Sequence, residues 1–346
     1  MRDSHRKIIE AVLEKAKTVP GGLDLLGIYG SAATGDMHEK SDLDLLIVPT
    51  VPEDWSRLTH TFILDDEQVG YDVYCTNWDM LEEDAECRHA NLGKFMDSEI
   101  LYERDDTVRE RLENLRRRAK EVLASEERFS RAEEALERSY MPYTAAMTAD
   151  NMADKRAYSA YVISLCLDAV MIYNGKYFRK GTKRTFEELQ GLVLPVSFED
   201  CIKGVINAED ATDADGALTD LMRTVRRFFL REEKKDPPAA EDLKGTYEEM
   251  VSNSKNKMTE AAENGDVYSS FMNMAFLQFM LAGISEDCNI PEYGVMESYS
   301  PIDLKANADL FDGILERYLE EYRKAGIKPK QYPDADAFVR AYLDTE

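Results

Sequence analysis

The sequence predicts an α+β protein, with a small mixed-sheet domain followed by a mostly α-helical body. Over the first hundred residues, short apolar runs of strand length alternate with helical patterns. Beyond them, apolar residues recur at helical spacing almost to the end of the 346-residue chain. Hydrophobic residues make up 44% of the sequence, which is ample for a core, and the length favours more than one domain.

The first hundred residues are predicted to hold one amphipathic helix, at 4–17, and four strands. LDLLGIY (23–29) and LDLLIV (43–48) are continuous apolar runs, as expected of strands buried on both faces. HTFIL (60–64) and QVGYDVYC (68–75) predict two more strands, joined by an acidic turn.

The remaining residues are predicted to be helical. A helix dense in both signs of charge covers 103–138, and a long helix covers 150–173 and ends at Asn174-Gly175. Further helices are expected at about 185–191, 198–208, 213–231, 244–264, 266–283, 306–325 and after Pro333. Within them, the Met- and Phe-rich run 271–280 is interpreted as core or as a helix–helix seam.

Three domains follow from this pattern. We expect the mixed-sheet domain at 1–100, a helical domain at 101–235 and a C-terminal helical extension at 244–346. The stretch 232–243 carries a Pro-Pro pair between charged residues and is the best candidate for a linker.

The charge balance excludes one large class of function. The chain has 43 basic and 68 acidic residues, a net charge of −25. Such a chain would repel duplex DNA or long RNA, so any anionic ligand must be small and bound at a locally basic or metal-filled site. The acidic excess favours solubility and is also compatible with a cationic substrate.

Neither a membrane nor a secreted location is expected. No uninterrupted run of about 18 apolar residues exists, and the N-terminus lacks the pattern of a secretory signal. The five cysteines are scattered without a CxxC pair, which fits a reducing cytoplasm, and the four histidines do not suggest a zinc site.

The run GIYGSAATGDMHEKSDLDLLIV contains the residues with the clearest chemistry. Gly30-Ser31 lies where a strand turns into a helix, so backbone N–H groups and the Ser31 hydroxyl could bind a phosphate. Asp42 and Asp44 are two residues apart at a strand, so their carboxylates point to one face. Two like charges this close call for a cation between them, and Mg²⁺ prefers such oxygen ligands.

A third carboxylate is expected on a neighbouring strand, and Asp72 fits best. In VGYDVYC it lies on the face opposite the apolar residues. Three carboxylates beside a phosphate-binding turn would make a two-metal centre for phosphoryl transfer.

Gly30-Ser31, Gly35 and Ser41-Asp42-Leu43-Asp44, followed by an apolar strand, resemble the core motif of the polymerase-beta-like nucleotidyltransferase superfamily. The likeness is closest to its small-molecule branch, which includes aminoglycoside and minimal nucleotidyltransferases, and covers about residues 20–80. The resemblance implies a mixed-sheet palm, two Mg²⁺ ions and transfer of a nucleoside monophosphate from a triphosphate, usually ATP. Gly30 and Ser31 would hold the triphosphate, Asp42 and Asp44 both metals, and Asp72 would be the third carboxylate.

A basic cluster in NGKYFRKGTKRTF (174–186) stands out in an acidic chain. Its ammonium groups could reach the triphosphate, and an aromatic ring beside them could stack on a base. Lys180 and Lys183 are the first candidates for nucleotide binding, together with Arg184. For the general base that takes the proton of the acceptor, Asp154 and Asp168 on helix 150–173 are alternatives, although Asp168 could equally be a salt-bridge partner.

The sequence therefore predicts a cytoplasmic, Mg²⁺- and ATP-dependent nucleotidyltransferase that modifies a hydroxyl of a small acceptor, such as a cationic aminoglycoside. One alternative is adenylylation of a protein partner, but more than 200 residues beyond the palm favour a private pocket for a small acceptor. Another alternative is a silent nucleotide-binding protein, which the presence of both Asp42 and Asp44 disfavours. The oligomeric state is open, with a homodimer among the options.

Overall fold

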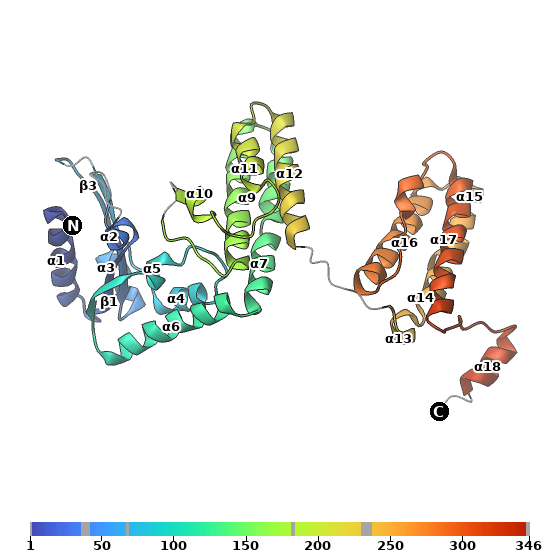
Figure 1. The fold of residues 1–346 in the computed structure, drawn as a ribbon, viewed down its shortest axis with the longest axis horizontal. Coiled ribbons are helices and arrows are strands. Elements are labelled where there is room, and N and C mark those ends of the chain that lie inside the picture. The colour runs from blue at the N-terminus through green and yellow to red at the C-terminus, as the bar shows by residue number, and fades with distance from the viewer. Residues whose placement is uncertain (1, 36–41, 67–68, 181–183, 230–236, 344–346) are drawn as a thin grey trace. The chain divides into compact units, whose positions relative to one another are not determined.

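The structure is a computed structural model that describes residues 2–35, 42–66, 69–180, 184–229 and 237–343. The chain divides into two compact units, Met1–Arg231 and Glu232–Glu346 (Figure 1). The division predicted near residue 100 lies within the first unit and stays a prediction. Of the predicted linker 232–243, residues 232–236 lie outside the described part of the chain.

The first unit is built on two small sheets. Strand β1 (Leu23–Tyr29) lies between β2 (Asp44–Pro49) and β5 (Glu99–Glu103), and both pairings are antiparallel. Strands β3 (His60–Leu64) and β4 (Val69–Val73) form an antiparallel hairpin. A parallel bridge between Ile47 and Cys75 connects the two sheets. This confirms the α+β class; among the described strands, parallel pairing is confined to that bridge.

Both faces of the central sheet are buried, which explains the continuous apolar runs. On one face Leu26, Ile28 and Ile47 pack with helix α1 (Asp3–Lys17). On the other face Leu25, Leu46 and Val48 belong to the core shared with the helices that follow. Strand β5 is an addition that the sequence analysis did not predict.

Short helices connect the strands of this unit. They are α2 (Gly30–Thr34), a 3₁₀ turn at Pro52–Asp54, α3 (Trp55–Leu58), α4 (Trp78–Ala85) and α5 (Gly93–Met96).

Among the described residues of the first unit, seven α-helices follow β5. They are α6 (Asp106–Ala124), α7 (Glu127–Glu137), α8 (Tyr140–Met147), α9 (Met152–Tyr173), α10 (Thr185–Glu188), α11 (Phe198–Asn207) and α12 (Ala211–Phe229). The single helix predicted at 103–138 is wrong, because Ser125 takes an extended backbone conformation and ends α6. The long helix predicted at 150–173 is confirmed as α9, which contacts α7, α8, α11 and α12.

The second unit is helical and has its own core. Its elements are α13 (Ala240–Leu243), α14 (Thr246–Met250), a π turn at Val251–Lys255, α15 (Asn256–Asn264), α16 (Val267–Asp287), a 3₁₀ turn at Val295–Ser298, α17 (Leu304–Lys324) and α18 (Ala335–Leu343). The core is formed mainly by α15, α16 and α17, with Met258, Leu277 and Phe311 among its buried side chains.

Helix α16 differs from expectation. By length and composition alone it is apolar enough to cross a membrane, although only 22% of that stretch is buried within the structure. The sequence analysis did not predict a helix of this hydropathy, because Ser, Asn and Gln interrupt the apolar run. These residues are polar but add no charge. The interpretation of 271–280 as core holds for Met274 and Leu277, whereas Phe279 is 76% exposed.

Candidate active site

The predicted phosphate-binding turn and the first Asp of strand β2 lie against each other. Tyr29, the last residue of β1, pairs with Asp44, the first residue of β2. Gly30 follows with a positive φ of 63°. A Cβ at Gly30 would overlap Oδ2 of Asp44, so the Asp44 carboxylate rests on bare backbone. Only glycine combines this backbone conformation with so close an approach.

Negative charge is concentrated at this point. Burial and the nearby charge of Asp42 raise the pKa of Asp44 to about 6. Burial, followed by the charges of Asp44, Asp42 and Asp72, raises the pKa of Tyr29 to about 12. A carboxylate whose pKa is raised by the charge of a second carboxylate would be stabilised by a cation bound between the two. The Asp42 and Asp44 donor set therefore fits an oxygen-preferring divalent ion such as Mg²⁺.

The three predicted carboxylates face two different hollows. Asp44 is half-buried and lines the larger cavity, whereas Asp42 and Asp72 are exposed and line a second cavity of about 510 Å³ beside the β3–β4 hairpin. Thr61 Oγ1 donates a hydrogen bond of 2.8 Å to Asp72. No three His, Cys, Asp or Glu side chains within the described ranges are grouped closely enough to hold a metal. The metal roles of Asp42, Asp44 and Asp72 stay predictions, and that of Asp72 has the least support.

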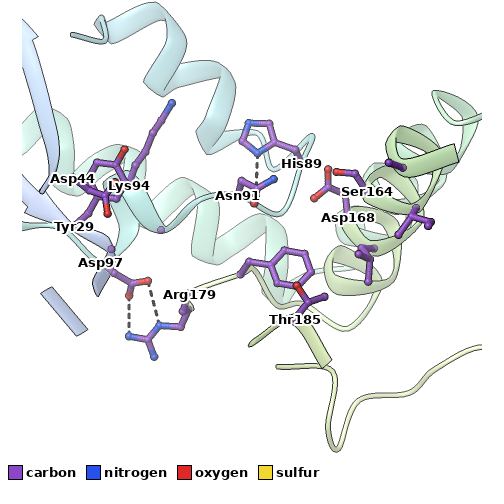
Figure 2. Close-up of a pocket in the computed structure, with 16 residues that line it drawn as sticks. Tyr29, Asp44, His89, Asn91, Lys94, Asp97, Ser164, Asp168, Arg179 and Thr185 are labelled. Atoms are coloured by element: carbon purple, nitrogen blue, oxygen red, sulfur yellow. Dashed lines mark hydrogen bonds and ion pairs between the residues drawn. The ribbon is translucent and has the colours of Figure 1, made fainter. Parts of the chain in front are cut away.

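The larger cavity has a volume of about 660 Å³ and lies between the sheet and helix α9. Figure 2 shows Tyr29 and Asp44 at one side and Asp168 and Ser164 on α9 at the other. This volume is within the range of small-molecule sites. The backbone at Gly30 and the Asp44 carboxylate that rests on it, which we call the Gly30–Asp44 turn, therefore form one wall of the cavity. Helix α9 forms the opposite wall.

The α9 wall is mostly apolar, with one buried carboxylate. Ala160, Ile163, Ser164 and Leu167 line the cavity one helical turn apart, together with Asp168. Burial raises the pKa of Asp168, and the hydrogen bond of 2.9 Å from the Ala90 N–H opposes this rise. Asp154, the other candidate base, is exposed at the start of α9, where its N–H donates to the side chain of Asn151. Asp154 is not among the residues that line the cavity.

A loop between α4 and α5 forms a third wall. His89 Nε2 and Lys94 Nζ lie 2.8 and 2.7 Å from the carboxylate of Asp84, which is buried. The Asn91 N–H donates a hydrogen bond of 3.2 Å to Nδ1 of His89, and Nε2 of the same ring faces Asp84. Burial alone would raise the pKa of Asp84, but the hydrogen bonds from His89 and Lys94 and their charges lower it.

The predicted basic cluster reaches the cavity only in part. Of the described residues in 174–186, Phe178, Arg179 and Thr185 line it. Arg179 lies 3.0 Å from Asp97, which also accepts a hydrogen bond from the Tyr177 hydroxyl (Figure 2 shows the Arg179–Asp97 pair).

The structure does not place the three basic residues proposed for nucleotide binding among the described residues that line the cavity. Lys180 Nζ lies 4.0 Å from Glu187, and Arg184 precedes helix α10. Neither is among the lining residues, and Lys183 lies outside the described residues. Their roles, like those of Gly30 and Ser31, stay predictions.

Sequence reasoning missed several residues that line the cavity. His89, Asn91, Lys94 and Asp97 come from a loop and a short helix without a recognisable motif. Charged residues make up 32% of the chain, so the ionisable residues between 89 and 97 did not stand out in the sequence.

A comparison with protein families agrees with the predicted class of nucleotidyltransferases. Residues 5–125 match the family model described as nucleotidyltransferase domain. This stretch contains the five strands that the structure describes, together with Gly30 and Asp44, and the match supports nucleotidyl transfer as the general activity of this part of the chain.

No curated protein matches the chain. One similar solved structure is that of a nucleotidyltransferase-like protein from Exiguobacterium sibiricum 255-15. It is 12% identical in sequence, with a TM-score of 0.37, and the similarity covers 75% of this chain and 91% of that chain.

Proposed function

We propose that this protein transfers a nucleoside monophosphate, AMP from ATP, to a hydroxyl group of a small acceptor and releases pyrophosphate. The observation that carries the proposal is the cavity between the Gly30–Asp44 turn and the buried Asp168 of α9. Such a cavity has a place for a triphosphate at one wall and for an acceptor at the other.

The residues of the chain take the following roles in this proposal. The backbone at Gly30 and the Ser31 hydroxyl bind the triphosphate, and Asp42 and Asp44, with Asp72 as the third carboxylate, hold Mg²⁺. When bound, the metal activates the attacking oxygen and stabilises charge on the phosphates. Lys180, Lys183 and Arg184 supply further positive charge to the triphosphate, and Asp168 takes the acceptor proton, for which a raised pKa is suitable.

The acceptor is small because the cavity is closed on the side of α9. Of the ionisable lining residues, Asp44, Asp97 and Asp168 are acidic, whereas His89, Lys94 and Arg179 are basic. This balance suits neutral hydroxylated acceptors as well as cationic ones such as aminoglycosides. Because all five cysteines are free, we further propose that the protein acts in the cytoplasm.

The test is pyrophosphate release from each nucleoside triphosphate with Mg²⁺ and a panel of hydroxylated acceptors. We expect Asp44→Asn to abolish turnover. Asp168→Asn should lower kcat by about 100-fold or more while nucleotide binding persists.

Asp154→Asn is the matched control, since Asp154 lies on the same helix but does not line the cavity. Full activity of Asp44→Asn would refute the proposed metal site. Equal effects of the Asp154 and Asp168 substitutions would refute the assignment of the base.

A further inference from the structure

Helix α16 carries an apolar surface that its own unit does not cover. Ser270, Met274, Leu277, Leu281 and Ser285 form the buried stripe of this helix. At 100° per residue, Tyr268, Met272, Phe276 and Phe279 lie on the opposite side, and we call these four residues the outer face of α16. Their exposed fractions are 74%, 46%, 38% and 76%, respectively.

No charged residue interrupts this helix between Val267 and Ser285. A helix that is apolar all round is normally buried on more than one side. The outer face of α16 is therefore expected to be covered when the protein is in its working state.

Helix α18, in the same unit, also exposes apolar side chains. It is amphipathic, and none of its described residues, 335–343, is buried. Phe338, Val339 and Leu343 are 44%, 48% and 75% exposed and together span about 140° of the helix surface. A nine-residue helix of this kind gains stability mainly by packing its apolar side against another surface.

We propose that α18 of one copy of this protein packs on the outer face of α16 of a second copy, and that the reverse contact forms at the same time. Such an isologous arrangement uses both apolar surfaces of each chain and closes as a two-fold dimer. The contact is a helix laid on an apolar helix face, with Phe279 and Phe338 as aromatic anchors.

The tether before α18 favours a second copy over the same chain. Ile327 packs against the core of the second unit, and the Lys330 N–H donates a hydrogen bond of 2.7 Å to Glu248 of α14. Only residues 331–334, which include Pro333, then separate this anchor from α18. A tether this short spans about 18 Å when fully extended, and proline limits how it can fold back.

The charge of the chain favours a protein partner over a lipid surface. Interfacial helices usually present Lys and Arg around their apolar face. In this chain the first charged residues after the apolar stretch of α16 are Glu286 and Asp287, and the net charge is −25. An anionic membrane would repel such a surface, whereas the apolar side of α18 would not.

The first experiment measures the mass of the full-length protein by analytical ultracentrifugation over a range of concentrations. We expect a dimer, and we expect Phe279→Glu and Leu343→Glu each to raise its dissociation constant about tenfold or more. Ile302→Glu is the matched control, because Ile302 is 92% exposed in the same unit but lies on neither surface. A monomer at all concentrations, or equal effects of all three substitutions, would overturn the proposal.

The second experiment identifies which chain α18 contacts. Phe279→Cys and Val339→Cys are made in separate full-length proteins of distinguishable mass, mixed and oxidised. A disulfide between the two proteins is expected. If instead only the double variant forms a disulfide, within one monomeric chain, the helix folds back on its own α16 and the proposal fails. Monomers that co-sediment with phosphatidylcholine and phosphatidylglycerol vesicles would show that the face binds lipid, which would also overturn it.

Discussion

At the scale of single residues, Gly30 offers a direct test of the geometry at the candidate site. Gly22 and Gly30 both have positive φ angles, 72° and 63°, so alanine at either position should cost about 1 kcal/mol of stability through backbone strain alone. Nothing would meet a Cβ at Gly22, whereas a Cβ at Gly30 would overlap the Asp44 carboxylate. Chemical denaturation should therefore show a loss of about 3 kcal/mol for Gly30→Ala, because overpacking adds to the strain.

Gly22→Ala is the control that isolates the strain. We also expect Gly30→Ala, and not Gly22→Ala, to weaken Mg²⁺ binding measured by calorimetry, since only the first substitution displaces Asp44. Equal losses of stability in the two variants would mean that Asp44 does not rest on Gly30.

At the scale of elements, the sequence located strands that form a short run of apolar and β-branched residues bounded by a turn or a polar residue. The strands 23–29 and 60–64 were predicted to the residue. Strand β5 was missed because its apolar run is only three residues long, 100–102, with Glu99 and Glu103 on either side of it. The break at Ser125 was missed because the charged pattern continues across it, and the packing of α7 against α9 decides the turn.

In the candidate site too, residues of a local motif could be predicted, whereas residues placed by tertiary contacts could not. Gly30 and Asp44, which line the larger cavity, were predicted because they belong to a local motif, whereas Asp42 of the same motif lines the second cavity. His89, Lys94 and Asp97 were not found, because tertiary contacts bring a loop to the cavity: Ala90 donates to Asp168 of α9 and accepts from the Phe178 N–H. Contacts of this kind join residues about 80 positions apart and leave no trace in spacing.

Asp84 of α4 holds this loop through its contacts with His89 and Lys94, which leads to a prediction about stability. Asp84→Asn removes the charge that holds His89 and Lys94, and it should destabilise the protein by about 2 kcal/mol at pH 7. The pKa of Asp84 is lowered in the folded protein, so its contribution is present above the pKa of an unfolded carboxyl, about 4, and is lost as the pH falls through the lowered value. Denaturation curves at pH 7 and pH 3 should thus show a smaller difference between the variant and wild type at pH 3.

Glu82→Gln serves as the comparison for Asp84→Asn. Glu82 forms an exposed ion pair with Arg111, which should contribute less than about 1 kcal/mol. A constant difference between Asp84→Asn and wild type across the pH range would show that the ion pairs do not carry its effect.

At the scale of the whole molecule, the two units have separate hydrophobic cores, and every residue proposed for catalysis or nucleotide binding belongs to the first. Because cooperativity follows a shared core, each unit should unfold in its own transition. Calorimetry of the full chain should show two transitions that match those of separately produced fragments 1–231 and 232–346.

The same division predicts where the activity lies. Fragment 1–231 should bind nucleoside triphosphate with the affinity of the full chain, because the turn at Gly30, the carboxylates and α9 all lie within it. Fragment 232–346 should retain the self-association carried by α16 and α18 but bind no nucleotide. Titration calorimetry and ultracentrifugation of the two fragments check these outcomes independently. Loss of nucleotide binding in a folded fragment 1–231 would mean that the second unit completes the site, and the cavity beside α9 would then be only part of it.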